Sequence, residues 1–408
     1  MTITKAPLHS MEIITPAADD RVAAKLPGNS HKKDRYKVLF VIDTLQTGGA
    51  EESLFNNVIR FNQITPVVCH LYAGDHLKKR FTDNGITVHS VGLQKKFGFR
   101  QAYKQLKSIV QKEQPDILVA YLTRSELITR MVSRFTHIPV IGTFVSDLYS
   151  GSYNAALSWK AKVAVSIFRW ANKRTARYCK GFVANSEVVK QTNGTALDIA
   201  ADKIEVINRG RDSKVFRFEV PQTNAGKPLR FLNVGRLVPV KGQNELISAF
   251  NEFLKTCPGA VLHIAGEGVA RASLAALITD LGLQNNVVLL GSRNDVPQLI
   301  NQYDCFVFPS HSEGFSGAIV EAMFAGLPVL ASDIDVNKEV ITHLKTGYLF
   351  EKGSVPAITK ALLWYKDNLS TANALAVKAN EHARKNFELT TIAEKLENYL
   401  LNMIIDKN

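Results

Sequence analysis

Two glutamates, Glu313 and Glu321, stand eight positions apart in a segment that is otherwise small or apolar, HSEGFSGAIVEAMFAG. A carboxylate accepts hydrogen bonds, so Glu321 can hold neutral hydroxyl groups such as those of a sugar. The start of a helix presents unpaired backbone N–H groups and the positive end of the helix dipole, which bind an anion such as a diphosphate. If a helix begins between the two glutamates, the segment therefore predicts a site for a sugar nucleotide.

The local pattern predicts that helix. Residues 305–308 form a short apolar run closed by a proline, which indicates a buried strand that ends in a loop. Apolar periodicity then follows over 317–325, Ser316 is a favourable N-cap, and a glycine stops the helix. A second strand is predicted over 328–331. This order places Glu321 about one and a half turns into the helix, near its open end.

Two further loops carry residue types that suit phosphate chemistry. GRLVPVKG (235–242) places Arg236 and Lys241 after a predicted strand, where together they can stabilise a departing diphosphate; the alternative is a solvated basic loop. Gly48 and Gly49 in TGGAEE allow a backbone to approach a phosphate, although a plain strand-to-helix turn explains them almost as well. The loop has neither the GxGxxG spacing nor the P-loop lysine, so the sequence predicts no dinucleotide site and no P-loop.

Composition predicts a globular chain. With 408 residues, 46% hydrophobic and 21% charged, it is long enough for two domains that each bury a core. It has no uninterrupted apolar run of about 18 residues and no apolar core of signal-peptide length near its start, so we expect a cytoplasmic location. Its four cysteines form no CxxC pair and its ten histidines show no ligand spacing, so we expect neither a metal site nor a disulfide framework.

The net charge of +13 is concentrated in one half of the chain. Residues 36–180 hold 21 Lys and Arg against 9 Asp and Glu, whereas residues 181–408 hold 23 against 24. Such a block indicates an anionic partner: a membrane, an acidic acceptor or nucleic acid. Nucleic acid is not expected, because the basic half has no RNP-like strand, zinc finger or helix-turn-helix.

One predicted helix in the basic half has two distinct faces. At 100° per residue, four basic residues lie close together and four apolar ones occupy the neighbouring sector. The basic residues are Lys162, Arg169, Lys173 and Lys180, and the apolar ones are Trp159, Val163, Ile167 and Trp170. This pattern predicts a helix that rests on an anionic membrane surface. The alternative is a core helix with an ordinary solvated face.

The chain alternates predicted strands and helices twice, which indicates an α/β protein with two doubly wound parallel sheets. We expect a disordered lead-in (1–35), a first domain (36–220), a second domain (221–389) that opens with a linker over 221–228, and a terminal helix (390–408). Ligands in such folds bind beyond the carboxyl ends of the strands, so the loops of both domains can face one cleft.

With EGFSGAIVE, GRLVPVKG, the GGAE loop and a two-sheet layout, the chain resembles glycosyltransferase family 4, the retaining, sugar-nucleotide-dependent enzymes with the GT-B fold. The match runs from about residue 36 to the C-terminus and is strongest over 229–350. The resemblance implies two Rossmann-like domains that face a central cleft, with the terminal helix packed back on the first.

The resemblance also assigns roles to matching residues. Glu321 would hold the ribose hydroxyls, while Glu313 and the amides of Gly314, Phe315 and Ser316 would meet the donor sugar. Arg236 and Lys241 would hold the diphosphate, and Ser292 and Arg293 would lie against the nucleobase.

Three segments depart from the family pattern. Val145 stands where many members carry a histidine, so Ser146 or Asp147 is the candidate to replace it, and we take Asp147 as catalytic. The usual N-G-V-D at the domain junction reads NRGRD (208–212), and the usual glycine pair before a glutamate reads DVNKE (335–339). These departures imply a donor or acceptor preference that differs from familiar members.

The resemblance implies a retaining glycosyltransferase without a cofactor or metal. Its donor would be a nucleoside diphosphate sugar linked to UDP or GDP. Its acceptor would be a glycan or lipid-linked molecule of surface polysaccharide or lipopolysaccharide assembly, met at the inner face of the cytoplasmic membrane. The alternatives are a nucleotide-sugar epimerase or a phosphorylase on the same fold, or a basic protein that binds nucleic acid or membranes.

Overall fold

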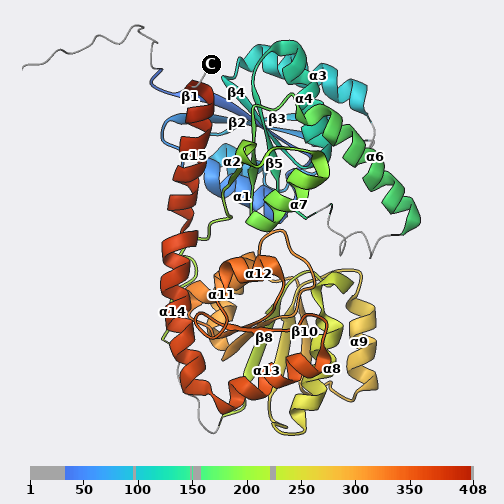
Figure 1. The fold of residues 1–408 in the computed structure, drawn as a ribbon, viewed down its shortest axis with the longest axis vertical. Helices are drawn as coiled ribbons and strands as arrows, with labels where there is room; N and C mark the ends of the chain where they lie inside the picture. The colour runs from blue at the N-terminus through green and yellow to red at the C-terminus, as the bar shows by residue number, and fades with distance from the viewer. Residues whose placement is uncertain (1–32, 95–97, 148, 150–157, 221–226, 406–408) are drawn as a thin grey trace, which may run out of the picture. The chain divides into compact units, whose positions relative to one another are not determined.

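The computed structural model describes residues 33–94, 98–147, 149, 158–220 and 227–405. These residues form two sheets in which every recorded strand pair is parallel (Figure 1). The prediction of two doubly wound parallel sheets is therefore confirmed. Most of the predicted lead-in (1–35) and of the predicted linker (221–228) lies outside the described residues.

The first sheet has the strand order β3-β2-β1-β4-β5-β6-β7. Its strands are β1 (Tyr36–Ile42), β2 (Ile64–Tyr72), β3 (Thr87–Leu93), β4 (Ile117–Tyr121), β5 (Val140–Phe144), β6 (Gly181–Ala184) and β7 (Ile204–Val206). The connecting helices are α1 (Gly49–Val58), α2 (Lys78–Asp83), α3 (Phe99–Glu113), α4 (Thr123–Thr136), α6 (Trp159–Ala176), α7 (Glu187–Leu197) and the 3₁₀ turn η1 (Ala201–Lys203).

The second sheet has the strand order β10-β9-β8-β11-β12-β13. Its strands are β8 (Arg230–Val234), β9 (Val261–Ala265), β10 (Val287–Gly291), β11 (Cys305–Phe308), β12 (Val329–Ser332) and β13 (Tyr348–Phe350). The helices that follow β8 in the chain are η2 (Pro239–Lys241), α8 (Gln243–Leu254), α9 (Arg271–Asp280), α10 (Val296–Leu299), η3 (Ile300–Gln302), α11 (Gly317–Ala325), α12 (Asp335–Val340), α13 (Val355–Asp367), α14 (Leu369–Phe387) and α15 (Leu389–Ile405).

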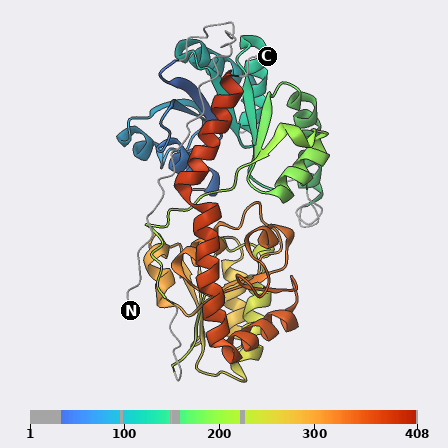
Figure 2. The ribbon, with the colours of Figure 1, turned by 60° about the vertical axis from the view of Figure 1, so that its left-hand side comes forward.

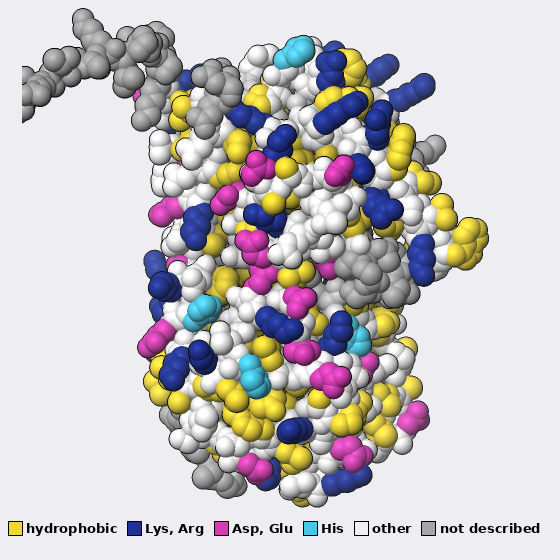
Figure 3. All heavy atoms as spheres, viewed as in Figure 1, with side chains coloured by type: hydrophobic (Ala, Val, Ile, Leu, Met, Phe, Trp, Pro, Cys, Tyr) yellow, Lys and Arg dark blue, Asp and Glu magenta, His cyan; other side chains and the backbone are white. Residues whose placement is uncertain are grey.

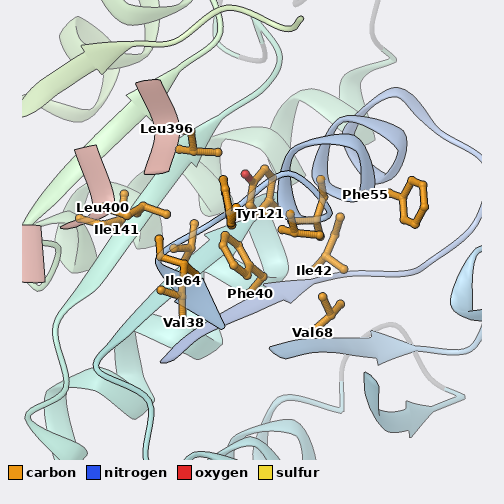
Figure 4. Close-up of a cluster of buried hydrophobic side chains, with 14 of the residues drawn as sticks. Val38, Phe40, Ile42, Phe55, Ile64, Val68, Tyr121, Ile141, Leu396 and Leu400 are labelled. Carbon is orange, nitrogen blue, oxygen red and sulfur yellow. The ribbon is translucent and has the colours of Figure 1, made fainter. Parts of the chain in front are cut away.

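Side-chain alternation along β1 divides the core of the first sheet into two layers. Val38, Phe40 and Ile42 point to one face and pack with residues of α1 and α15 (Figure 4), whereas Leu39 and Val41 point to the other. The second layer is covered by α3, α4 and α7. Because both faces are covered, the central strands read as continuous apolar runs.

The terminal helix α15 packs against the first sheet, although it follows the whole second sheet in the sequence (Figures 1 and 2). Its residues Ile392, Leu396 and Leu400 belong to the same core cluster as β1. The buried Glu397 accepts hydrogen bonds from the backbone N–H groups of residues 62–64 at 2.6–3.0 Å. The side chain of Glu397 thus fixes the start of β2 to the end of the chain.

Local pattern and structure agree closely around the two glutamates. The strand predicted over 305–308 is β11, and the helix predicted over 317–325 is α11. The prediction for Lys180 was wrong: α6 ends at Ala176, and Lys180 Nζ instead donates to the carbonyl of Met403 at 2.9 Å. Lys180 therefore does not extend the basic face of α6.

Candidate active site

Glu313 lies in the loop between β11 and α11, where two neighbours fix its carboxylate. Lys241 Nζ donates to Glu313 Oε1, and Ser310 Oγ donates to the same oxygen at 2.6 Å. The Lys241 and Glu313 side chains are only 14% and 11% exposed, so salt screens their attraction weakly. The pair joins the two loops that the sequence analysis selected for phosphate and sugar chemistry.

Two glycines allow the loop of Lys241 to pack against its neighbours. Gly242 has a φ of +69°, and a Cβ there would collide with the carbonyl oxygen of Pro309. Gly266, with a φ of +150°, likewise faces the carbonyl oxygen of Gly235 too closely for a Cβ. The loops after β8, β9 and β11 are therefore in backbone contact, which places Lys241 against the glutamate loop.

Glu321 lies on α11, and its partner is Arg211 from the segment between β7 and β8. Arg211 Nε donates to Glu321 Oε1 at 2.6 Å, and Arg211 Nη1 donates to the carbonyl of Gly210 at 3.0 Å. The guanidinium also lies across the first turn of α11, because a Cβ on Gly317 would collide with it. A cation is unfavourable at a helix start, so Glu321 offsets that cost. No role was predicted for Arg211, although the departure from N-G-V-D at 208–212 was a signal in the sequence.

Ser316 occupies the N-cap position of α11, as predicted, but its hydroxyl makes no capping hydrogen bond. Ser316 is fully buried, and its Oγ donates to Asn337 Oδ1 at 2.5 Å. Asn337 lies in the DVNKE segment, which forms α12, and its amide also donates to the carbonyl of Ser332 at 2.8 Å. A buried amide oxygen thus competes for the hydroxyl, and the first-turn N–H groups of α11 have no cap from Ser316.

The segment after β5 passes directly against the glutamate loop. A Cβ on Gly314 would lie 2.8 Å from the carbonyl oxygen of Val145, so only glycine fits there. Ser186 Oγ donates to the carbonyl of Gly314 at 2.9 Å and also accepts from the backbone N–H of Val189, which caps α7. Ser186 therefore both caps α7 and contacts the loop that holds Glu313. Asp147 follows Val145 by two residues and is half-buried. Its catalytic role stays a prediction.

The glycine loop before α1 contacts charged groups on both sides. A Cβ on Gly48 would collide with the carboxylate of Glu51, and one on Gly49 would lie 2.8 Å from Nη1 of Arg209. Burial raises the pKa of Glu51. Burial, followed by the neighbouring Arg211, lowers the pKa of Arg209 to about 10. The environment of the Arg209 guanidinium thus disfavours its charged form, although it remains protonated at neutral pH.

The remaining predicted residues lie at the carboxyl ends of β8, β10 and β11. Arg236 is exposed and its side chain forms no ion pair within the described part of the chain. Ser292 and Arg293 are exposed after β10, where Arg293 Nε donates to Asp295 at 2.8 Å. Phe315 is buried, and its ring lies 5.8 Å from that of Phe387, so only its backbone can meet a ligand.

Helix α6 buries only Asn172 and Ala176 of its 18 residues. Its apolar residues Trp159, Val163, Ile167 and Trp170 are 50–71% exposed, so the alternative of a core helix is wrong. Yellow and dark blue side chains gather at the upper right of Figure 3, where α3, α4 and α6 lie in the same view. Among the described helices, none has the length and apolarity needed to cross a membrane. Within the same residues, no group of three or more His, Cys, Asp or Glu could hold a metal ion.

Two family descriptions match consecutive parts of the chain. "Glycosyltransferase Family 4" matches residues 49–215, and "Glycosyl transferases group 1" matches residues 216–385. The boundary between the two matches falls after β7 and before β8, so each description covers most of one sheet.

Curated relatives align over most of the chain. An Escherichia coli UDP-Gal:alpha-D-GlcNAc-diphosphoundecaprenol alpha-1,3-galactosyltransferase is 25% identical over 74% of this chain and 79% of its own length. The capsular polysaccharide biosynthesis glycosyltransferase CapM of Staphylococcus aureus is 24% identical over 84% of this chain and 92% of its own length.

Solved structures share the fold. Anabaena HepE in complex with UDP and glucose superimposes with a TM-score of 0.77 at 22% identity, covering 90% of this chain and 100% of that one. Sucrose-phosphate synthase of Thermosynechococcus elongatus gives a TM-score of 0.75 at 15% identity, covering 90% and 99%. Together with the two parallel sheets, these neighbours confirm the predicted GT-B fold.

Proposed function

We propose that this chain moves a sugar from a UDP- or GDP-linked sugar to a lipid-linked glycan acceptor, with retention of configuration. The chain belongs to glycosyltransferase family 4 and is a glycosyltransferase. The observation that carries the proposal is the pair of anchored glutamates around the start of α11, Glu313 with Lys241 and Glu321 with Arg211. Relatives whose names describe a diphosphoundecaprenol acceptor and capsular polysaccharide support the acceptor class.

The donor half of the proposal follows from charge and hydrogen-bonding capacity. Lys241 is anchored by Glu313 beside the start of α11, and the exposed Arg236 has no competing carboxylate among the described residues. These two cations and the N–H groups of α11 would hold the diphosphate and stabilise its charge as it departs. Glu321 would accept hydrogen bonds from the ribose hydroxyls.

The proposed retention of configuration is what the resemblance to family 4 implies. With the diphosphate held by Arg236, Lys241 and α11, the acceptor hydroxyl would attack from the face that the leaving group occupies. The new bond then keeps the anomeric configuration. The cations would replace a metal clamp, so activity should survive chelation with EDTA. Complete loss of activity in EDTA that magnesium or manganese restores would contradict the proposal that transfer needs no metal.

The proposed acceptor requires access to a membrane. The exposed apolar residues of α6 adjoin Lys162, Arg169 and Lys173 on the same helix, the composition of a helix that lies at a lipid interface. We place the enzyme peripherally on the inner face of the cytoplasmic membrane, in surface polysaccharide or lipopolysaccharide assembly. Vesicle binding tests this part separately.

Thermal unfolding with a panel of UDP- and GDP-linked sugars tests the donor. A ligand at 100 times its Kd should stabilise the fold by about 2.7 kcal/mol. The panel is repeated with Glu321→Gln, which should lose most of the shift, and with Glu252→Gln, an exposed glutamate on α8, which should keep it. Equal shifts in all three proteins, or none with any sugar nucleotide, would reject the assignment. NMR of the transferred sugar's anomeric proton then tests retention.

A further inference from the structure

We propose that the groove between α3, α4 and α6 binds the hydrocarbon chain of the lipid-linked acceptor. The inference rests on the proposed function and adds a site to it. It differs from the proposed membrane contact of α6, because it places one lipid chain inside the protein surface rather than the protein on a bilayer.

The groove has the size and chemistry of a hydrocarbon site. Its volume is about 970 Å³, at the upper end of the range of roughly 300–1,000 Å³ that ligand pockets span. The lining is mostly apolar and includes Leu127, Met131, Phe135, Ala164 and Ile167. Met131, Phe135 and Ile167 are 38%, 56% and 62% exposed, so the apolar surface faces solvent in the absence of a ligand. The ring of Tyr103 from α3 packs edge-on against that of Phe135, 6.0 Å away, and joins two walls of the groove.

A buried polar network joins α4 to α6 beside the groove. The fully buried Arg130 on α4 donates from Nη1 to Asn172 Oδ1 on α6 at 2.8 Å and pairs through Nη2 with Glu126 at 3.0 Å. Asn172 lies in the last turns of α6, so the network holds one end of the helix. The preceding turns bury no residue, although they carry four large apolar side chains. Such an apolar helix face indicates a binding surface.

The positive charge around the groove favours an anionic lipid over a neutral one. The three helices carry twelve Lys and Arg and only two carboxylates, Glu113 and Glu126. Glu113 pairs with Lys37 at 3.2 Å and lies 2.9 Å from His89, while Glu126 pairs with Arg130, so both carboxylates already have partners. Arg100 and Lys104 line the groove itself. A hydrocarbon chain that ends in a phosphate complements this surface, whereas a neutral lipid does not.

The course of α4 connects the groove to the candidate active site. Leu127 to Phe135 span about 12 Å along the groove, at 1.5 Å per residue. One turn earlier, Thr123 and Glu126 line a small cavity at the ends of β4 and β5, which Ser146 also lines. The backbone of Val145 and Ser146 in turn touches Gly314 in the glutamate loop. A hydrocarbon chain bound in the groove can therefore direct its phosphate end toward the candidate active site. This direction favours the lipid-linked acceptor, rather than bulk lipid, as the occupant of the groove.

A soluble probe tests the site without the transfer reaction. Farnesyl phosphate, a C15 isoprenyl phosphate, is titrated into the full chain below its micellar concentration. Ala164→Trp fills the groove from an exposed position, and Ala161→Trp makes the same change one turn earlier on α6, outside the lining. We expect the wild type and Ala161→Trp to bind alike and Ala164→Trp to bind at least ~10-fold more weakly. Thermal unfolding checks that both variants fold. Equal binding by all three proteins, or no binding by the wild type, would overturn the site.

Transfer kinetics test whether the occupant is the acceptor. With a long-chain lipid-linked acceptor, Ala164→Trp should raise KM at least ~10-fold and leave kcat unchanged, whereas a short-chain acceptor with the same head group should show no difference. Unchanged KM for the long chain would reject the acceptor as occupant. If the wild type transfers sugar to no lipid-linked acceptor, the proposed function fails and the acceptor assignment with it, while the titration still reports on the groove.

Discussion

The segment of Glu313 and Glu321, which comprises the loop before α11 and α11 itself, carries its charges in a different way from the surface of α6. In the first region both carboxylates have a basic partner, and the side chains of the two ion pairs are 11–25% exposed. On α6, Lys162 and Arg169 form no ion pair with any described residue, and Lys173 reaches only the exposed Asp198 at 3.5 Å. Paired, half-buried charges hold a fixed geometry, whereas exposed charges beside apolar side chains suit a partner that is itself a surface. The difference supports the proposals that the first region performs the chemistry and that α6 docks on a membrane.

Charge reversal on α6 should have the largest effect. Changing Lys162, Arg169 and Lys173 to Glu should weaken binding to anionic vesicles by about 3 kcal/mol or more, at about 1 kcal/mol for each basic group near the surface, or roughly 100-fold. Donor binding should be unchanged. Co-sedimentation with anionic and neutral vesicles at low and high salt measures the loss.

The matched control reverses Lys360, Lys378 and Lys395, which are exposed on α13, α14 and α15 and give the same net charge. If both triple variants bind vesicles like the wild type, α6 is a solvated helix and the contrast between the two regions loses its meaning.

Removing either carboxylate should be the next largest change. Glu313→Gln and Glu321→Gln should each lower turnover at least ~10-fold, about 1.4 kcal/mol or more, because Lys241 and Arg211 lose their anchors. Steady-state kinetics with circular dichroism separates this loss from unfolding. Near-normal turnover in both variants, similar to Glu252→Gln, would show that the pairs are structural only.

The stability of the two kinds of ion pair can be compared directly. Arg211→Ala leaves the partly buried Glu321 without its partner and should cost about 1 kcal/mol of unfolding free energy. Lys255→Ala breaks the pair with Glu252, whose side chains are 68% and 46% exposed, and should cost less than ~0.5 kcal/mol. Urea denaturation at constant pH measures both. An equal cost would mean that burial does not distinguish these pairs.

The smallest expected effect concerns the exposed tryptophans. Trp159→Ala with Trp170→Ala should change the free energy of unfolding by less than ~0.5 kcal/mol, because both rings are more than two-thirds exposed. The same double variant should lose affinity for vesicles. Phe250→Ala, at a fully buried position on α8, should instead cost about 3–5 kcal/mol. A large stability loss in the tryptophan variant would show that α6 packs its apolar face on protein.

Sequence reasoning reached the strand and helix around the glutamates because their signals are local. Proline and glycine bound each element, and apolar periodicity fills it. It missed the partners that come from distant segments: Arg211 lies 110 residues before Glu321, and Ser186 lies 128 before Gly314. It also assigned Ser316 to the helix start, where a local rule favours capping, while Asn337 from another helix takes the hydroxyl. A pattern within one short segment does not show that a distant side chain competes for the same hydroxyl.

Prediction from the sequence also missed two short strands and one helix end. β7 and β13 have three residues each, too few for a hydrophobic pattern to emerge. The end of α6 at Ala176 leaves Lys180 to meet the carbonyl of Met403, 223 residues away. The face of α6 itself was predicted correctly as amphipathic, since periodicity needs no knowledge of the rest of the fold.

The position of α15 has a consequence for synthesis on the ribosome. Residues 392–404 complete the core of the first sheet, and Glu397 ties down the start of β2, yet the ribosome makes them only after the whole second sheet. At about 5–20 residues per second, the 199 residues between β7 and the end of α15 take roughly 10–40 s to translate. During that time the newly made first sheet exposes an apolar face that its own sequence cannot cover. A chaperone that shields nascent apolar surface would find its substrate there, and packing of α15 onto the sheet would end that exposure.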